Sequence, residues 1–224
     1  MKKKIFILAP HADDEILGCG GSISKFNKLG YHINVLILTN ANLGAPEIYS
    51  SKEINLIRKE SKIANDFIGT KKLYFENLPA LNLRNYPIYK ISNIISKYIK
   101  NIDPEIIFLP STKDIHEDHK IIFHAAKIAI RPNKRNNLKK ILSYEVLSET
   151  EWNENEQSFN PNYFVKLRSL DIKNKIKAFQ KYKSQVKKFP HPRSKEAILS
   201  LSRVRGSQVF MDYAEAFKVE KILD

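Results

Sequence analysis

Two short clusters of acidic residues and histidines hold the side chains of this chain that could do chemistry. The segment His11-Ala12-Asp13-Asp14-Glu15 directly follows an apolar run at residues 5–9, and His116-Glu117-Asp118-His119 forms the second cluster. Carboxylates packed this closely repel one another and lose hydration, so a positive partner must offset them. A divalent metal ion held by nitrogen and oxygen ligands is such a partner. The two clusters therefore predict the two halves of one metal site.

The spacing within each cluster predicts hydrolytic chemistry. His11 and Asp14 lie three residues apart, and His116 and His119 repeat that spacing. One carboxylate and two imidazoles form a common hydrolytic zinc set, which leaves a fourth position for water. The metal lowers the pKa of that water and polarises a bound carbonyl, while a carboxylate outside the set takes the proton. Asp13 is placed for that role, and the histidine of the second pair that does not bind metal can stabilise an oxyanion or protonate a leaving group.

The elements that must position these clusters alternate between strands and helices. Apolar runs predict strands at residues 4–9, 32–39, 72–75, 106–109 and 140–146, and helical patterns are found at residues 15–29, 51–68, 88–100, 118–130 and 170–187. This alternation predicts an α/β fold with a Rossmann-like, mostly parallel sheet flanked by helices. Ligands of such sheets bind beyond the carboxyl ends of the strands, and both clusters directly follow a predicted strand. We therefore expect the active site at that edge.

Length and composition favour one domain. The 224 residues fit a single domain, with an α/β core at residues 1–146 and cap elements of the same domain at residues 147–224. The single cysteine, Cys19, excludes an internal disulfide framework and a thiolate metal cage. No segment has the length of a membrane span or the pattern of a signal peptide, so we expect a cytoplasmic protein. A homo-oligomer is compatible with the sequence.

The formal net charge of +14 invites a nucleic-acid or anionic-membrane interpretation. Lysine dominates over arginine, however, and asparagine and isoleucine are also abundant. These three residue types share A/T-rich codons, so base composition accounts for much of the bias. The lysines are also spread widely along the chain. We therefore expect no nucleic-acid partner, while an anionic small-molecule substrate remains compatible with the charge.

At these motifs the chain resembles the LmbE-like or PIG-L deacetylases. Their first signature, Pro/Ala-His-Pro-Asp-Asp-Glu, is present as Pro10-His11-Ala12-Asp13-Asp14-Glu15, and their second, His-Pro-Asp-His, as His116-Glu117-Asp118-His119. Ala12 and Glu117 replace prolines that carry no ligand atoms. The similarity runs nearly the full length and includes Tyr182-Lys183-Ser184-Gln185. It implies an enzyme that removes the N-acetyl group of an amino sugar or its conjugate and releases acetate and a free amine.

The resemblance also implies roles for individual residues. His11, Asp14 and His119 would hold Zn²⁺, although Fe²⁺ or Co²⁺ could occupy the same set. Asp13 would be the general base, and His116 the electrophilic or acid histidine. Asp118 would orient His116.

Other residues are weaker candidates for contacts with substrate. Arg58 lies where an arginine of the family is often near substrate, Glu15 extends the first cluster, and His191 stands between two prolines in a predicted loop. The loop at residues 39–44 keeps only one threonine and one glycine of the family's pattern. The acceptor sugar therefore need not be that of the best-known members.

Three alternatives stay open from the residues alone. The first cluster could be an acidic helix N-terminus, in which Asp13 only caps the helix. Two histidines and a carboxylate also form the site of non-haem iron oxygenases, although those enzymes usually have all-β folds. A basic nucleic-acid-binding module would instead show tight and steeply salt-dependent binding.

Overall fold

The computed structural model describes residues 2–131, 137–153 and 158–223. Within these residues seven strands form one sheet, in the order β3-β2-β1-β4-β5-β7-β6. The strands are β1 (Lys4–Ala9), β2 (His32–Asn40), β3 (Lys72–Pro79), β4 (Ile106–Pro110), β5 (Lys140–Tyr144), β6 (Tyr163–Lys166) and β7 (Ala214–Ile222). The first five pair in parallel, whereas β7 runs antiparallel to both β5 and β6. The mostly parallel α/β sheet predicted from the sequence is confirmed.

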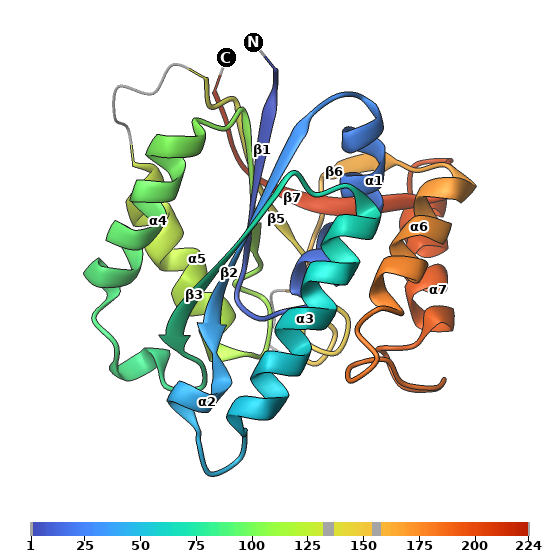
Figure 1. Cartoon of the computed structure of the whole chain (residues 1–224). Coiled ribbons are helices and arrows are strands. Elements are labelled where there is room, and N and C mark those ends of the chain that lie inside the picture. Colours follow the sequence, from blue (N-terminus) through green and yellow to red (C-terminus); the bar gives the residue numbers. More distant parts are fainter. Residues whose placement is uncertain (1, 132–136, 154–157, 224) are drawn as a thin grey trace.

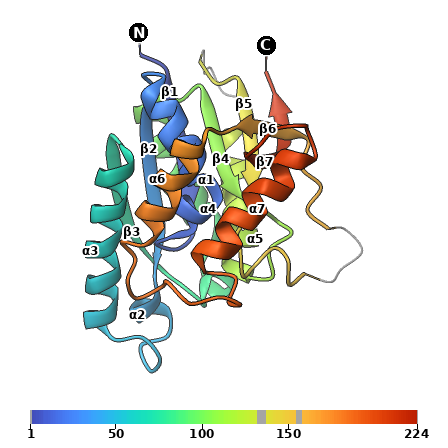
Figure 2. The same ribbon diagram turned by 90° about the vertical axis from the view of Figure 1, so that its right-hand side faces the viewer.

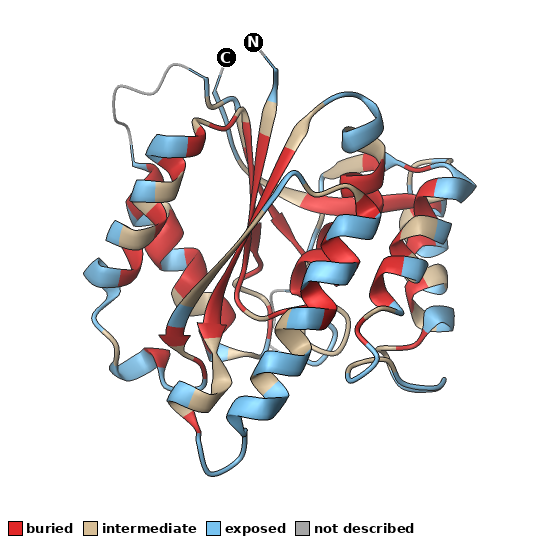
Figure 3. Ribbon diagram, in the orientation of Figure 1, coloured by how far each residue is buried: buried red, intermediate tan, exposed pale blue. Residues whose placement is uncertain are grey.

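Helices cover both faces of the sheet (Figures 1 and 2). One face carries α1 (Asp14–Lys28), α3 (Ser51–Ile68), α6 (Ser169–Phe179) and α7 (Lys195–Ser207), and the other carries α4 (Ile88–Ile102) and α5 (Glu117–Ile130). Two short turns, α2 (Ala41–Gly44) and η1 (Leu83–Asn85), follow β2 and β3. The central strands are buried almost throughout (Figure 3). Strands β1 and β4 consist almost entirely of Ile, Leu and Phe, because a strand covered by helices on both faces buries the side chains of both faces.

The order of the strands fixes where a ligand can bind. From β1 the chain proceeds outward through β2 and β3, and from β4 it proceeds the other way to β5. The switch point of this sheet therefore lies between β1 and β4, where the two crossover directions leave a crevice. Their carboxyl ends lie at the lower edge of the sheet in Figure 1, on the side of α2. Both acid–histidine clusters start there, directly before α1 and α5.

The C-terminal third differs from the sequence-based expectation. The helix predicted at residues 170–187 ends at Phe179, and α7, β6 and β7 were not predicted. Strand β7 inserts antiparallel between β5 and β6, a pairing that local periodicity does not specify. Part of the connection between β5 and β6 lies outside the described residues. No helix in the described part of the chain is long and apolar enough to cross a membrane, and the cytoplasmic location stays a prediction.

Candidate active site

Three side chains, His11, Asp14 and His119, meet at the switch point in an arrangement that could hold a metal ion, and we call them the ligand set. Asp14 Oδ2 lies 3.2 Å from His119 Nε2 and 3.3 Å from His11 Nδ1, and the two ring nitrogens are 3.3 Å apart. His119 and Asp14 are buried, whereas the His11 side chain is 27% exposed. One ligand atom from each residue falls within 4.8 Å of the others, a spacing at which a single cation can touch all three.

A buried carboxylate fixes the ring of His119. Asp114 Oδ2 lies 2.6 Å from His119 Nδ1, and Asp114 Oδ1 accepts a hydrogen bond from the Thr150 hydroxyl. With a metal ion bound, Nδ1 would keep its proton on Asp114 and Nε2 would offer its lone pair to the ion, the arrangement that metal-binding histidines generally have. Burial disfavours a charged ring, but Asp14 and Asp114 outweigh it and raise the pKa of His119 to about 10. The set is thus built to attract positive charge.

Asp118 contacts a different histidine from the one expected. Its carboxylate lies 3.1 Å from His11 Nε2 and accepts a hydrogen bond from the Leu81 N–H at 2.8 Å. The contact with His116 involves the backbone instead, because the Asp118 N–H donates to His116 Nδ1. Asp118 therefore contacts the ring of His11 and not that of His116, and His116 caps the N-terminus of α5. His11, His116 and Asp118 also form a second group whose ligand atoms approach within 4.8 Å.

His116 is held as a neutral hydrogen-bond donor. Burial and the adjacent His11 and His119 rings lower its pKa to about 4. Its Nδ1 accepts the Asp118 N–H, so the proton of the neutral ring sits on Nε2. The ring centroid lies 4.5 Å from that of His11. A neutral donor beside the ligand set can bind a developing oxyanion.

Asp13 does not act as a helix cap. Although it precedes α1, its carboxylate makes no capping hydrogen bond, and its φ of 113° is a conformation that L-residues rarely adopt. The side chain instead accepts a hydrogen bond of 2.9 Å from Arg193 Nη1. Burial raises the pKa of Asp13 to about 7, even though Arg193 opposes the shift. A carboxylate outside the ligand set with a pKa near neutrality is suited to proton transfer.

Arg193 was not predicted from the sequence. It belongs to the segment between α6 and α7, and its guanidinium also donates to Gln185 Oε1 and the Ser148 hydroxyl. In the sequence, His191 was the one residue of this segment that was singled out as a candidate for contact with substrate. Two segments far from Asp13 in the sequence, the loop after β5 and the α6–α7 connection, thus meet at the guanidinium that contacts Asp13.

An open pocket of about 390 Å³ lies over these groups. His11, Asp13 and His116 form its floor, and the segment from α2 to α3 supplies a mainly apolar wall with Tyr49 and Leu56. The polar part of the lining, which we call the polar wall, consists of Glu149, Ser184, Gln185 and Arg193. The pocket can therefore hold a polar molecule against the ligand set.

Comparison with known proteins identifies the family. Residues 6–130, which include both clusters, match the family described as PIG-L, GlcNAc-PI de-N-acetylase. The chain belongs to the PIG-L family. It is 29% identical over 188 residues to the uncharacterized deacetylase YaiS of Escherichia coli K12, covering 82% of this chain and 92% of YaiS.

Two further similarities extend this finding. Diacetylchitobiose deacetylase of Thermococcus kodakarensis is 24% identical over 193 residues, which cover 82% of this chain and 70% of that protein. The crystal structure of TT1542 from Thermus thermophilus superimposes with a TM-score of 0.78 at 24% identity, over 98% of this chain and 96% of that one. The chain therefore has the same fold as TT1542. The family and its relatives identify it as an N-deacetylase, an enzyme that hydrolyses amide bonds other than peptide bonds.

The three weaker candidates for contacts with substrate lie away from the pocket or are engaged elsewhere. Glu15 is fully buried and binds Asn65 and the Tyr182 hydroxyl, so no substrate can reach it. Arg58 Nη2 donates to the Glu76 carbonyl at 2.6 Å and to Asn77 at 2.8 Å. His191 is exposed and outside the pocket lining, and its Nδ1 accepts the N–H of Arg193.

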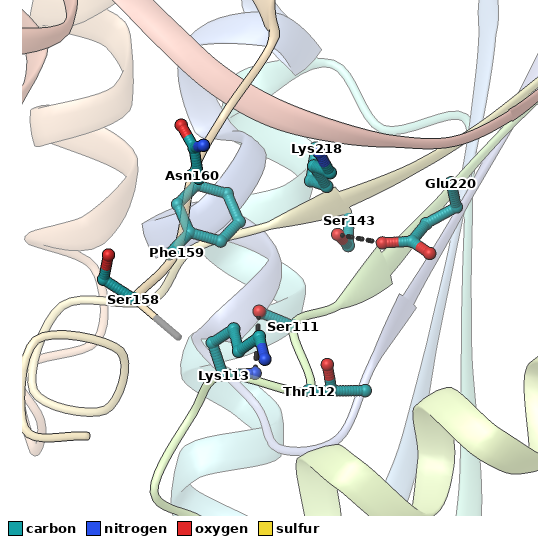
Figure 4. A pocket seen from close by; sticks show the side chains of 9 residues that line it. All are labelled: Ser111, Thr112, Lys113, Ser143, Ser158, Phe159, Asn160, Lys218 and Glu220. Carbon is teal, nitrogen blue, oxygen red and sulfur yellow. Dashed lines mark hydrogen bonds between the residues drawn. The ribbon is translucent and has the colours of Figure 1, made fainter. Parts of the chain in front are cut away.

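A second cavity of about 400 Å³ in this PIG-L chain is separate from the ligand set (Figure 4). Its lining comes from the loop after β4, from β5 and β7, and from residues 158–160. In Figure 4 Ser143 donates to Glu220, and the Phe159 ring faces the same space. The cavity shares no lining residue with the pocket over Asp13.

Proposed function

We propose that this chain hydrolyses the N-acetyl group of an amino sugar or amino-sugar conjugate and releases acetate and a free amine. The single observation that carries the proposal is Asp13, a pocket carboxylate next to the ligand Asp14 but bound to Arg193 instead of the ligand set. A hydrolase needs such a base beside its metal, whereas a non-haem iron oxygenase does not.

The residues at the switch point fit a divalent metal ion. His11, Asp14 and His119 would hold it, and Asp118 and Asp114 would orient the two imidazoles. We propose Zn²⁺, with Fe²⁺ and Co²⁺ as ions that the same ligands accept. When bound, the metal supplies Lewis-acid polarisation of the amide carbonyl and lowers the pKa of water.

Asp13 and His116 would move and hold the protons. Asp13 takes a proton from the attacking water, and Arg193 keeps the carboxylate aimed into the pocket. The Nε2–H of His116 donates to the oxygen that gains negative charge at the former carbonyl. Asp13 then returns its proton to the departing nitrogen, so the amine leaves neutral and the base is restored.

An amino-sugar substrate is supported by the pocket and by the relatives. The polar wall of Glu149, Gln185 and Arg193 offers acceptors and donors for hydroxyl groups. Diacetylchitobiose deacetylase, a relative over most of this chain, is named for an N-acetylated sugar. The whole chain 1–224 is proposed to act as one domain, because the α6–α7 segment supplies Arg193 and β7 pairs with β5.

Acetate release from a panel of N-acetyl sugars, measured with metal-replete protein, tests the proposal. We expect turnover of at least one N-acetylglucosamine derivative, and loss of both bound metal and activity in His119→Ala. Full metal affinity in that variant would contradict the assignment of His119 as a metal ligand.

Absence of acetate release across free, disaccharide, nucleotide-linked and lipid-linked sugars would overturn the proposed function. Tight DNA binding that falls steeply with salt in a filter-binding titration would favour the nucleic-acid alternative instead.

A further inference from the structure

The pocket continues inward as a smaller apolar space of about 70 Å³ between β2 and α3. We call it the inner recess, and its lining consists of His11, Ala12, Ile37, Thr39, Ala41, Ile54, Ile57 and Arg58. Five of these residues, His11, Ala12, Ala41, Ile54 and Ile57, also line the larger pocket. The two spaces therefore adjoin, and His11 of the ligand set lines both.

The polar residues of the inner recess are engaged elsewhere. Thr39 Oγ1 donates to the Pro10 carbonyl at 2.7 Å, which leaves its methyl group to the wall. The Arg58 guanidinium lies 5.1 Å from the Phe75 ring centroid and donates to the end of β3. Aliphatic atoms of Ile37, Ile54 and Ile57 then dominate the wall. Such a surface favours an apolar occupant over a hydroxyl-bearing one.

The polar wall and the apolar inner recess indicate which end of the substrate lies on which side of the ligand set. The scissile carbonyl must lie at the ligand set, within reach of Asp13 and His116. The sugar on the nitrogen side then meets the polar wall of Glu149, Gln185 and Arg193. The acyl group on the other side of the carbonyl is left facing the inner recess, where Ile54 and Ile57 lie.

We propose that the inner recess is an acyl-chain subsite, so that this enzyme accepts short linear N-acyl groups longer than acetyl. The inference rests on the proposed amide hydrolysis. A single water molecule needs about 10–15 Å³ of cavity volume. A recess of about 70 Å³ exceeds what one methyl group requires and holds a chain of several carbon atoms. Ala41 and Ile57 both line this recess, so their size changes the space that it offers.

A series of N-acylglucosamines tests the subsite, because every member releases the same amine. We expect kcat/KM to rise about fourfold per added methylene from acetyl through propionyl to butyryl, the factor that burial of about 0.8 kcal/mol per methylene gives. It should fall again at hexanoyl, which exceeds the space. Ala41→Leu should reverse the preference toward acetyl, and Ile57→Ala should move the optimum to longer chains.

Ile63→Ala is the matched control. It removes an isoleucine from the same helix, but Ile63 is 55% exposed and lines neither space. We expect its activity and its acyl preference to equal those of the unchanged protein. Thermal melts of the three variants show whether each is folded, and the opposite directions expected for Ala41→Leu and Ile57→Ala separate selectivity from loss of stability.

Calorimetry of the product carboxylates gives a second measure that does not depend on turnover. Butyrate should bind the metal-replete protein more tightly than acetate, and Ala41→Leu should abolish the difference. Strict acetyl preference that neither variant shifts, together with equal acetate and butyrate affinities, would overturn the subsite while leaving deacetylation intact. Release of no amine from any member, with tighter butyrate binding retained, would contradict the proposed hydrolysis but support the subsite.

Discussion

The floor and the polar wall of the pocket are built in different ways. The floor and the ligand set, which share His11, come from two motifs that follow the adjacent parallel strands β1 and β4. Buried carboxylates contact the imidazoles of His11 and His119. In the wall, Glu149, Gln185 and Arg193 come from loops far apart in the sequence. Arg193 links the two regions, because it belongs to the wall and donates to Asp13 on the floor.

This difference indicates which region is shared and which varies. Strand ends in a packed sheet hold side chains to fixed positions, so the floor suits chemistry that must stay the same. Loops on such a scaffold can change without disturbing the core. The family match at residues 6–130 covers the floor, whereas the wall residues 149, 185 and 193 lie beyond it. We expect mutations in the floor to affect reaction and metal, and mutations in the wall to affect substrate and base orientation.

The largest effect should come from Asp13→Asn. The amide cannot accept the proton of the attacking water, so kcat should fall about 10²–10⁴-fold. Because Asp13 is outside the ligand set, metal content measured by atomic absorption should equal that of the unchanged protein. Retained turnover at full metal content would remove Asp13 from its role as the base.

Asp114→Asn should have the next largest effect and tests whether the floor depends on its buried carboxylates. The neutral amide forms a weaker hydrogen bond to His119 Nδ1 than the carboxylate does. Metal affinity should therefore drop about 10–100-fold in a chelator competition titration. Thr150→Val, which removes only the hydroxyl that contacts Asp114, is the milder control. Unchanged affinity in Asp114→Asn would show that the ligand set is held by packing alone.

Arg193→Gln should have an intermediate effect and tests the link between the two regions. The Arg193 charge lowers the pKa of Asp13, which burial has raised to about 7. Without that charge the pKa rises further, so less of the base is ionised at neutral pH. The acid limb of the kcat profile should move to higher pH. Activity at pH 7 should fall about fivefold for the first pH unit of that shift and about tenfold for each further unit. An unmoved acid limb would mean that Arg193 contacts only substrate.

The smallest effect should come from His191→Ala. The ring is exposed and does not line the pocket. In its one described hydrogen bond, the ring Nδ1 accepts the Arg193 N–H. We expect kcat/KM on the best N-acetyl sugar to stay within about twofold of the unchanged protein, as for most surface substitutions. A loss comparable to that of Arg193→Gln would assign the loop backbone, and not the guanidinium alone, to the positioning of Asp13.

The order of the elements and the placement of both clusters could be predicted because each depends on local patterns. Apolar runs such as β1 and β4 mark buried parallel strands, and parallel strands carry their carboxyl ends to one edge. The C-terminal elements could not be predicted in the same way. Strand β7 pairs with β5 across a long sequence separation, and α7 begins beyond a loop rich in proline and lysine.

Local patterns in the chain were enough for the α/β class and for the placement of the two clusters, since strand periodicity acts over short distances. Only the folded molecule shows that Asp118 orients His11, that Asp114 fixes His119, and that Arg193 holds Asp13. These contacts join side chains brought together only when the strands and loops pack. Their geometry depends on the burial and hydrogen bonding of the whole fold, which no local pattern encodes.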